Sequence, residues 1–478
     1  MASKKTLNAK NLEALGAERL AELLIEISTG NSVAKRRLRL ELAGTESPAE
    51  VAREIRKRLT ATSRSRSFVD WQNMRALVSD LETQHRAIVD QVAKADPISG
   101  LDLIWRFLAL ASSIFGRSDD GSGTLIDVFH LACSDLGKIA KAANTDSKTL
   151  ADHAFQALKE NDYGQYDGLI EALTPALGQE GLEHLKQRII ALSGEPVRRP
   201  PDKERQVIGW GSGGPIYADE MAERSRLSTV RLALKEIADA QGDVDAFIAQ
   251  YDDQTRKVPK IAAEISQRLL AAGRADEAWQ TIESTENRRS GWPDFEWEDA
   301  RIDVLDALGR GEDAQAARWS CFERYLSAEH LRAHLKRLGD FDDVEAENRA
   351  LDQARAYKNP LQALSFLVSW PDLDRAADLV IHRAGELDGN YYEVLTPAAD
   401  AFAGKHPLAA TLVLRAMIDF TLTRSRSSRY RHAARHLMEC ARLASSVADF
   451  GTFETHEAYA TRVRREHERK ISFWSLFS

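Results

Sequence analysis

The sequence predicts an all-α protein: a helical-repeat (tetratricopeptide-like) α-solenoid that is preceded by an N-terminal helical bundle. Short turns recur in the second half of the chain at steps of 31, 36, 30, 32 and 33 residues, which is the period of stacked helix–turn–helix repeats. Runs of β-branched residues with a period of two, typical of strands, are absent. The breakers that mark the turns are Gly242, Gly273, Gly309, Gly339, Pro371 and Gly404.

Each turn also carries the chemistry of a helix start. An acid or a proline stands three positions after the breaker, where free N–H groups and the positive end of the helix dipole favour it. These residues are Asp245, Asp276, Glu312, Asp342, Asp374 and Pro407. We expect the residue five positions after each breaker to pack closely: Phe247, Ala278, Ala314, Val344, Ala376 and Ala409.

The first 193 residues predict a helical bundle, because apolar residues return every three or four positions. Ser47-Pro48-Ala49-Glu50 has an N-cap serine, a proline at the first helical position and an acid at the third. Besides the helix that starts there, we expect helices over residues 12–27, 71–93, 97–115, 125–142, 147–161, 166–177 and 181–192.

Proline and glycine gather between Ser193 and Pro215, at a density that cannot continue a helix. The sequence therefore predicts three parts: an N-terminal helical domain over 1–193, a Pro/Gly-rich linker or loop over 194–216, and a helical-repeat domain over 217–478.

The composition is that of an ordinary globular protein with a net charge of −8, distributed unevenly. Residues 1–66 carry +6 and residues 424–470 carry +5, which leaves −19 for the rest. Basic ends could contact a polyanion, although solvated helix faces are the simpler interpretation. No apolar run reaches the length of a membrane span and no signal peptide is recognisable at the start, so we expect no membrane association. The scattered cysteines Cys133, Cys321 and Cys440 favour a reducing cytoplasm.

Two patterns resemble ligand sites but lack a necessary element. The glycine-rich stretch Gly209–Gly214 has no Lys-Ser/Thr after it, as a phosphate loop requires. His330 and His334 stand four residues apart, but Arg332 lies between them where a zinc hydrolase needs a glutamate. We therefore expect no cofactor and no metal. Because each of these patterns lacks a necessary residue, we also expect no enzymatic activity from them.

Arg431 and His436 give one alternative. Their spacing, an arginine, four residues and a histidine, resembles the motif of helical ribonucleases of the HEPN class, in which a dimer brings both side chains to a cleft. A solvated basic helix face explains the same residues.

The aromatic cluster Trp292, Phe295 and Trp297 predicts a binding site for a partner peptide, because large flat side chains near a loop are effective anchors. Packing of one repeat on the next is the alternative.

Three C-terminal stretches, over residues 404–415, 429–437 and 465–470, resemble the helical region of bacterial SWIM zinc-finger proteins. Most of the chain resembles an uncharacterised bacterial family of unknown function, with matching N-terminal features at residues 36–44 and 119–123. The resemblance implies an all-helical fold and no particular activity. The Cys-x-Cys and Cys-x-His ligands of the zinc finger are missing, so its zinc-dependent binding of nucleic acid is not implied here.

A solenoid of this kind predicts a non-catalytic scaffold with a protein partner. The alternative function is binding or cleavage of nucleic acid through the basic C-terminal helices.

Overall fold

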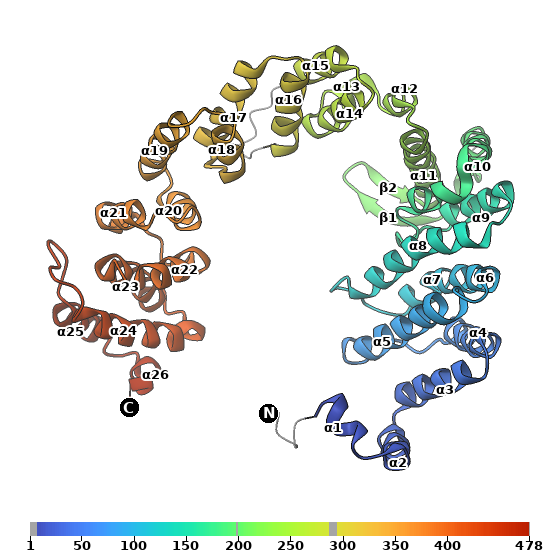
Figure 1. Cartoon of the computed structure of the whole chain (residues 1–478), viewed down its shortest axis with the longest axis horizontal. Helices are drawn as coiled ribbons and strands as arrows, with labels where there is room; N and C mark the ends of the chain where they lie inside the picture. The colour runs from blue at the N-terminus through green and yellow to red at the C-terminus, as the bar shows by residue number, and fades with distance from the viewer. Residues whose placement is uncertain (1–6, 197–198, 286–293, 478) are drawn as a thin grey trace. The chain divides into compact units, whose positions relative to one another are not determined.

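The computed structural model describes residues 7–196, 199–285 and 294–477. The chain forms two compact units, Met1–Asp253 and Gln254–Ser478. The predicted all-α class is confirmed, because helices make up nearly all of the regular structure in both units (Figure 1). The helices of the first unit are α1 (Ala9–Glu13), α2 (Ala17–Ser28), α3 (Ser32–Glu46), α4 (Pro48–Arg64), α5 (Trp71–Ala87), the π-helical turn η1 (Ile88–Val92), α6 (Pro97–Leu108), α7 (Ala111–Phe115), α8 (Thr124–Ala143), α9 (Ser147–Lys159), α10 (Leu169–Ser193), the 3₁₀ turn η2 (Asp202–Glu204), α11 (Ala218–Gln241) and α12 (Val244–Ile248).

The second unit is a stack in which consecutive helices from α14 to α25 pack on one another, and several also pack on the one after, as α20 does on α22 and α21 on α23. Its helices, after α13 (Asp253–Arg256) at the boundary, are α14 (Pro259–Ala271), α15 (Ala275–Glu283), α16 (Phe295–Ala307), α17 (Gly311–Tyr325), α18 (Ala328–Leu335), α19 (Asp342–Arg355), α20 (Pro360–Ser369), α21 (Leu373–Arg383), η3 (Ala384–Glu386), α22 (Tyr392–Phe402), α23 (Pro407–Thr423), η4 (Ser427–Arg429), α24 (Tyr430–Ala444), α25 (His456–Glu466), α26 (Ile471–Trp474) and η5 (Ser475–Phe477).

All six predicted breakers lie between consecutive helices. Gly242, Gly273 and Gly309 have positive φ angles of 68°, 74° and 70°, which glycine adopts without a steric cost. In several turns the residue directly after the breaker caps the next helix. Asp243 accepts a hydrogen bond from the Ala246 amide at 3.0 Å, and Asp372 does the same for the Arg375 amide.

The predicted packing positions are buried in five of the six repeats, and Val344 is the exception. Val344 is 54% exposed, so the prediction for this residue is wrong. In α19 the buried face runs through Ala346, Ala350 and Ala354, and Val344, two residues before Ala346, points roughly 200° away around the helix.

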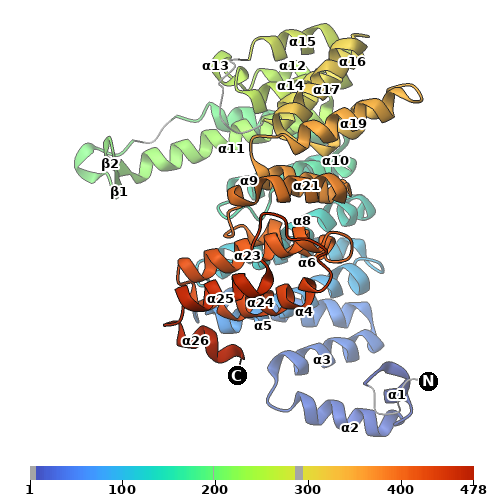
Figure 2. The ribbon, with the colours of Figure 1, turned by 90° about the vertical axis from the view of Figure 1, so that its left-hand side faces the viewer.

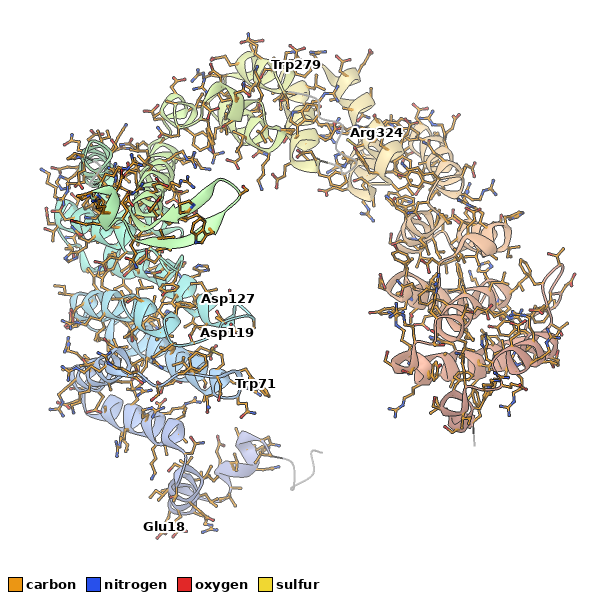
Figure 3. All side chains as sticks on the ribbon, turned by 180° about the vertical axis from the view of Figure 1, so that it is seen from behind. Glu18, Trp71, Asp119, Asp127, Trp279 and Arg324 are labelled. Atoms are coloured by element: carbon orange, nitrogen blue, oxygen red, sulfur yellow. The ribbon has the colours of Figure 1, made fainter. Side chains whose placement is uncertain are left out.

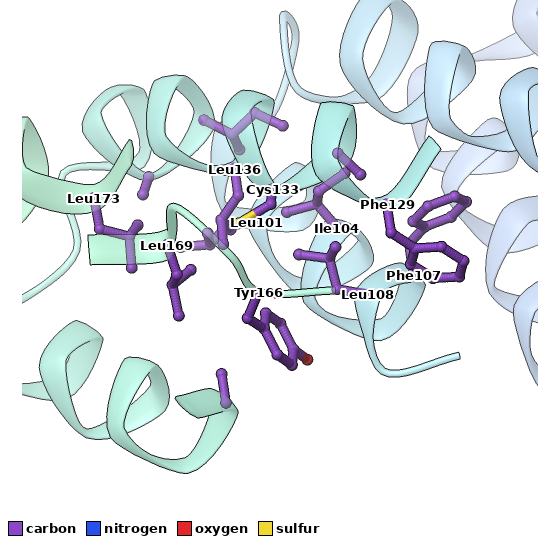
Figure 4. Packing of buried hydrophobic residues seen from close by; sticks show 14 of the residues in the cluster. Leu101, Ile104, Phe107, Leu108, Phe129, Cys133, Leu136, Tyr166, Leu169 and Leu173 are labelled. Carbon is purple, nitrogen blue, oxygen red and sulfur yellow. The ribbon is translucent and has the colours of Figure 1, made fainter. Parts of the chain in front are cut away.

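The core of the first unit is a continuous set of buried side chains from α3 to α11, part of which Figure 4 shows. The predicted helices are present, with breaks that periodicity did not show. Residues 12–27 divide at Gly16, and residues 97–115 divide into α6 and α7. The two helices predicted over 166–177 and 181–192 form one element, α10, which begins at Leu169 and has a kink at Gly178. Ser47 caps α4 as predicted, accepting a hydrogen bond from the Glu50 amide.

One segment, Pro97–Phe115, is long and apolar enough to cross a membrane by length and composition. It contains α6, whose side chains Leu103, Ile104 and Phe107 are fully buried inside the unit. A core helix of a folded domain has these properties, and α6 packs against α4 and α8.

The Pro/Gly-rich stretch contains two strands that the sequence did not predict. β1 (Val207–Gly211) and β2 (Gly214–Tyr217) pair antiparallel, and Figure 2 shows this hairpin at the N-terminal end of α11. Arg205 fixes its base: the guanidinium pairs with Asp219 and Glu220 and lies 3.7 Å from the centre of the Tyr217 ring. This tertiary anchor, rather than a period-two pattern, holds the hairpin.

The two compact units meet at Asp253, whereas the sequence placed the boundary in the linker over 194–216. The reason is the C-terminal half of α11. Its side chains Val230, Ala233 and Ile237 belong to the hydrophobic core of the first unit and pack with α10. The helix that the sequence assigned to the repeats therefore completes the first core.

Candidate functional site

The aromatic cluster predicted as a binding site has two members within the described residues, and Trp292 lies outside them. Phe295, the first residue of α16, contacts Tyr325 of α17 and His330 of α18, with ring centres 5.5 and 5.9 Å apart. Trp297 donates a hydrogen bond from Nε1 to Thr285 Oγ1 at 3.1 Å. Such contacts join consecutive helices, as the packing alternative predicts, and a binding role for Trp292, Phe295 and Trp297 stays a prediction.

His330 and His334 also serve packing. His330 is buried, and its Nδ1 lies 2.7 Å from Ser327 Oγ while its Nε2 lies 3.0 Å from Asp299 Oδ1. His334 Nδ1 lies 3.3 Å from the Gln315 carbonyl oxygen. The described residues hold no group of three or more His, Cys, Asp or Glu side chains arranged for a metal ion.

Arg431 and His436 lie on α24 but do not share a face, since five residues correspond to about 140° around the helix axis. Arg431 is exposed and His436 is half-buried. Burial, reinforced by the positive charge of Arg435, lowers the pKa of His436 to about 4. The imidazole is therefore neutral at pH 7, and a catalytic role for the pair stays a prediction.

A concave surface in the first unit is a candidate binding site. A groove of about 510 Å³ lies between α5, η1 and α8 in the first unit. Its lining residues recur at helical spacing along both walls: Val78, Glu82, His85, Arg86, Val89 and Asp90 on one, and Thr124, Asp127, Val128, Leu131 and Asp135 on the other. We call this feature the α5–α8 groove. At 1.5 Å per residue each wall runs for roughly 16–18 Å, or about eleven residues of a helix.

Large apolar side chains stand open to solvent at the groove. Leu131 on the α8 wall is 56% exposed. Trp71 begins α5 seven residues before Val78, on the same helical stripe, and is 79% exposed. Trp71 and Asp127 project to the same side of the first unit (Figure 3). An exposed tryptophan and leucine flanking a concave surface are typical of a binding surface.

His85 lies on the wall and is only 6% exposed. Its Nε2 is 3.1 Å from Asp135 Oδ2 but has no hydrogen-bond partner in an aligned position. Burial lowers the pKa of His85, and the Asp135 carboxylate opposes this effect. His85 and Asp135 therefore join the two walls at the base of the groove, and the buried Nε2 atom faces Asp135 rather than solvent.

The helix changes its winding next to His85. Residues Ile88–Val92 form a π-helical turn, closed by a hydrogen bond from the Ala93 amide to the Ile88 carbonyl oxygen at 2.8 Å. Such a turn widens the helix by one residue and occurs frequently at functional sites. Here it falls at the end of the α5 wall, where Val89 and Asp90 line the groove.

The groove is acidic. Its carboxylates are Glu82, Asp90, Asp127 and Asp135, and Arg86 is the one cationic residue among its lining residues. Lys94 pairs with Asp90 and Lys138 with Asp135, each at 2.8 Å. Glu82 and Asp127 are exposed and form no ion pair among the described residues. Arg86 offsets part of this charge, and the lining residues stay net negative.

The sequence indicates one wall of the α5–α8 groove. Trp71, Val78 and His85 recur every seven residues, which places them on one helix face. Nothing in the spacing shows that this face stays open, because that depends on which helix lies beside it. No pattern in the sequence distinguishes His85 or Asp135 from other residues on their helix faces.

Residues 2–476 match the model of a family described as a family of unknown function, DUF6880. The chain belongs to this family. No curated protein matches the chain. Among solved structures, one in the complex titled "Structure of Naa15/Naa10 bound to HypK-THB" is similar over 93% of this chain and 68% of that chain, with 13% identity and a TM-score of 0.31. A TM-score this low supports no conclusion, and the fold of this DUF6880 member rests on its own helices.

Proposed function

We propose that this protein is a non-catalytic interaction scaffold, and that the α5–α8 groove holds a basic, amphipathic helical segment of a partner protein. The observation that carries the proposal is the combination of an excess of carboxylates over cations with the exposed Leu131 among the lining residues of one groove. A stack of helices supports this role, because it provides an extended surface without needing a closed active site.

Charge complementarity identifies the occupant. Glu82 on one wall and Asp127 on the other form no ion pairs within the part of the chain that the structure describes, so lysine or arginine side chains of a partner can neutralise both. Leu131 offers apolar contact within the groove, and Trp71 lies about two helical turns before Val78 on the same face of α5. A helix with one apolar and one basic face satisfies both requirements, and the groove length fits about three turns of such a helix.

Designed peptides test this proposal directly. Two labelled 14-residue helices share a leucine face and differ in the polar face, which carries lysine in one and glutamate in the other. Fluorescence anisotropy with the full-length protein should show binding of the lysine peptide and at least about tenfold weaker binding of the glutamate peptide. A lysine peptide of the same composition with scrambled order, which loses its apolar face, should also bind more weakly.

Charge reversal supplies the matched variants. Glu82→Lys/Asp127→Lys should weaken binding of the lysine peptide by at least about tenfold, since like charges then face each other. Asp162→Lys/Asp202→Lys changes the net charge equally at exposed positions outside the groove and should bind as the wild type does. Equal loss in both variants, or no preference for the lysine peptide, overturns the groove as the binding site.

The natural partner can be sought with the same pair of variants. A protein captured by the wild type and by the Asp162/Asp202 variant, but not by the Glu82/Asp127 variant, is the expected partner. The cytoplasm is the compartment we propose for this interaction, supported by Cys133, Cys321 and Cys440, which are free thiols buried in the structure. We also propose that the C-terminal helices are related to the helical region of SWIM proteins and that the protein is bacterial.

A further inference from the structure

We propose that the first unit contains a second site, independent of the α5–α8 groove, which binds a small phosphate-bearing anion. The site is a pocket of about 240 Å³ where α3, α4 and α5 meet. Its charged and polar lining residues are Arg36, Arg39, Glu54, Lys57, Arg58 and Gln84. We call it the α3–α5 pocket.

A buried carboxylate organises the arginines. Asp80, whose side chain is 4% exposed, accepts hydrogen bonds from Arg36 Nε at 2.9 Å and from Arg58 Nε at 2.8 Å. A second contact joins Arg58 Nη2 to Asp80 Oδ2 at 2.6 Å. A guanidinium has five N–H groups, so both arginines keep donors beyond those that Asp80 uses. Asp80 therefore fixes two half-buried cations in place without consuming their hydrogen-bonding capacity.

The remaining charges leave the pocket positive. Lys57 binds Glu54 at 2.7 Å, and this hydrogen bond lowers the pKa of the Glu54 carboxyl, which stays ionised at neutral pH. Arg39 forms no ion pair among the described residues. With Asp80 and Glu54 both counted, the four cations leave a net formal charge of +2, which a phosphate dianion balances.

Gln84 gives a second, independent indication of a ligand. It lines the pocket, is 2% exposed, and its Oε1 has no hydrogen-bond partner among the described residues. A buried amide oxygen without a partner is uncommon in a folded protein. The amide oxygen and nitrogen exchange places on a flip, so this side chain can present its NH₂ group to an anion.

Gln84 and His85 are neighbours on α5, yet they line different cavities. The helix thus separates an acidic groove from a basic pocket. Residues 1–66 are basic in the sequence, and four of their cations line this pocket, because α3 and α4 supply all of them. A solvated helix face does not explain a buried carboxylate with two arginines and an unpartnered glutamine around one cavity.

Inorganic phosphate is the probe for the test, at constant ionic strength set with sodium chloride. Isothermal titration calorimetry of the full chain should show saturable binding at pH 7.5. The affinity should fall at pH 5.5, because phosphate then carries one charge instead of two. Glycerol 3-phosphate should bind as well, since the proposal requires only the phosphate group.

The variant Arg39→Gln/Lys57→Gln removes two exposed cations of the pocket and leaves Asp80 and its arginines intact. It should bind phosphate at least about tenfold more weakly, as expected for the loss of charge-assisted hydrogen bonds. The matched control is Lys35→Gln/Arg37→Gln, on the same helix α3, exposed and outside the pocket. This control should bind as the wild type does.

Circular dichroism confirms that each variant folds before it is titrated. Equal weakening in both variants reveals non-specific attraction to a basic surface and overturns the proposal. Absence of saturable binding by the folded wild type also overturns it. Neither result bears on the α5–α8 groove, whose peptide titration uses different residues, so the two proposals fail separately.

Discussion

The carbonyl oxygen of Ala172 on α10 occupies the place that a β-carbon on Gly137 of α8 would need, with only 2.0 Å between them. The two helix backbones therefore touch at a point where no side chain fits. Gly137 is fully enclosed among the described helices of the first core, beside Leu136 (Figure 4). This close approach positions α8, which forms one wall of the α5–α8 groove.

Gly137→Ala should destabilise the protein by about 1–3 kcal/mol or more, because the helices must separate to admit the methyl group. Chemical denaturation monitored by circular dichroism measures the loss. Gly194→Ala is a suitable control, since the nearest atom to a β-carbon there is 3.6 Å away. Equal stability of the Gly137 variant and the wild type contradicts the observed contact.

Ala278 and Ala314 are fully buried at the packing positions of two repeats. Replacing either with leucine should lower the free energy of unfolding by about 1–3 kcal/mol, because the larger side chain overpacks the helix contact. Val344 occupies the corresponding sequence position but is exposed, so Val344→Ala should change stability by less than about 0.5 kcal/mol. If the substitution at Val344 is as harmful as the other two, the packing face of α19 differs from the one described.

Glu236 titrates at an unusual pH. Burial, with the negative charges of Asp167, Glu171 and Asp239, raises the pKa of its carboxyl to about 7 from an ordinary value of 4.5. The folded protein thus holds a proton that the unfolded chain releases, and stability is lost as the pH rises from about 4.5 through 7.

Glu236→Gln should consequently be more stable than the wild type at pH 8, on the order of 1–2 kcal/mol after allowance for solvent screening, and nearly equal to it at pH 4. Urea unfolding at both pH values measures the difference. Asp162→Asn, at an exposed position, is the control. A stability gain of the same size at both pH values shows that proton binding is not its cause.

Trypsin should cut the Pro/Gly-rich segment after Lys203 before it cuts after Arg205. Lys203 is exposed, whereas the Arg205 side chain is 7% exposed and held by Asp219 and Glu220. Mass spectrometry of early fragments identifies the order. Asp219→Asn/Glu220→Gln releases Arg205 and should make both sites comparably sensitive. Earlier cleavage inside the repeats contradicts the expected sensitivity of this segment.

Labelled single-stranded RNA should remain intact when incubated with the purified protein. His436 is neutral at pH 7 and does not share a helix face with Arg431. Cleavage by the wild type that is absent from Arg431→Ala/His436→Ala contradicts this prediction and favours the nucleic-acid alternative. A nuclease contaminant is revealed if the double variant cleaves at the same rate.

The sequence by itself determined the repeats. A breaker, an acid that starts the next helix and a small packing residue act within a few positions of one another, so local chemistry suffices to place Gly242 or Ala278. The same local signals located the helix starts of the first unit, as at Ser47.

Only the tertiary structure decided the features that join distant segments. Val344 is exposed because the buried face of α19 runs through Ala346, Ala350 and Ala354. The hairpin after Arg205 exists because a guanidinium meets carboxylates fourteen and fifteen positions later. The α5–α8 groove requires His85 and Asp135, fifty residues apart, to face each other. Periodicity gives the face of a helix but not the neighbour that covers it, and the burial, charge and pKa of a site depend on that neighbour.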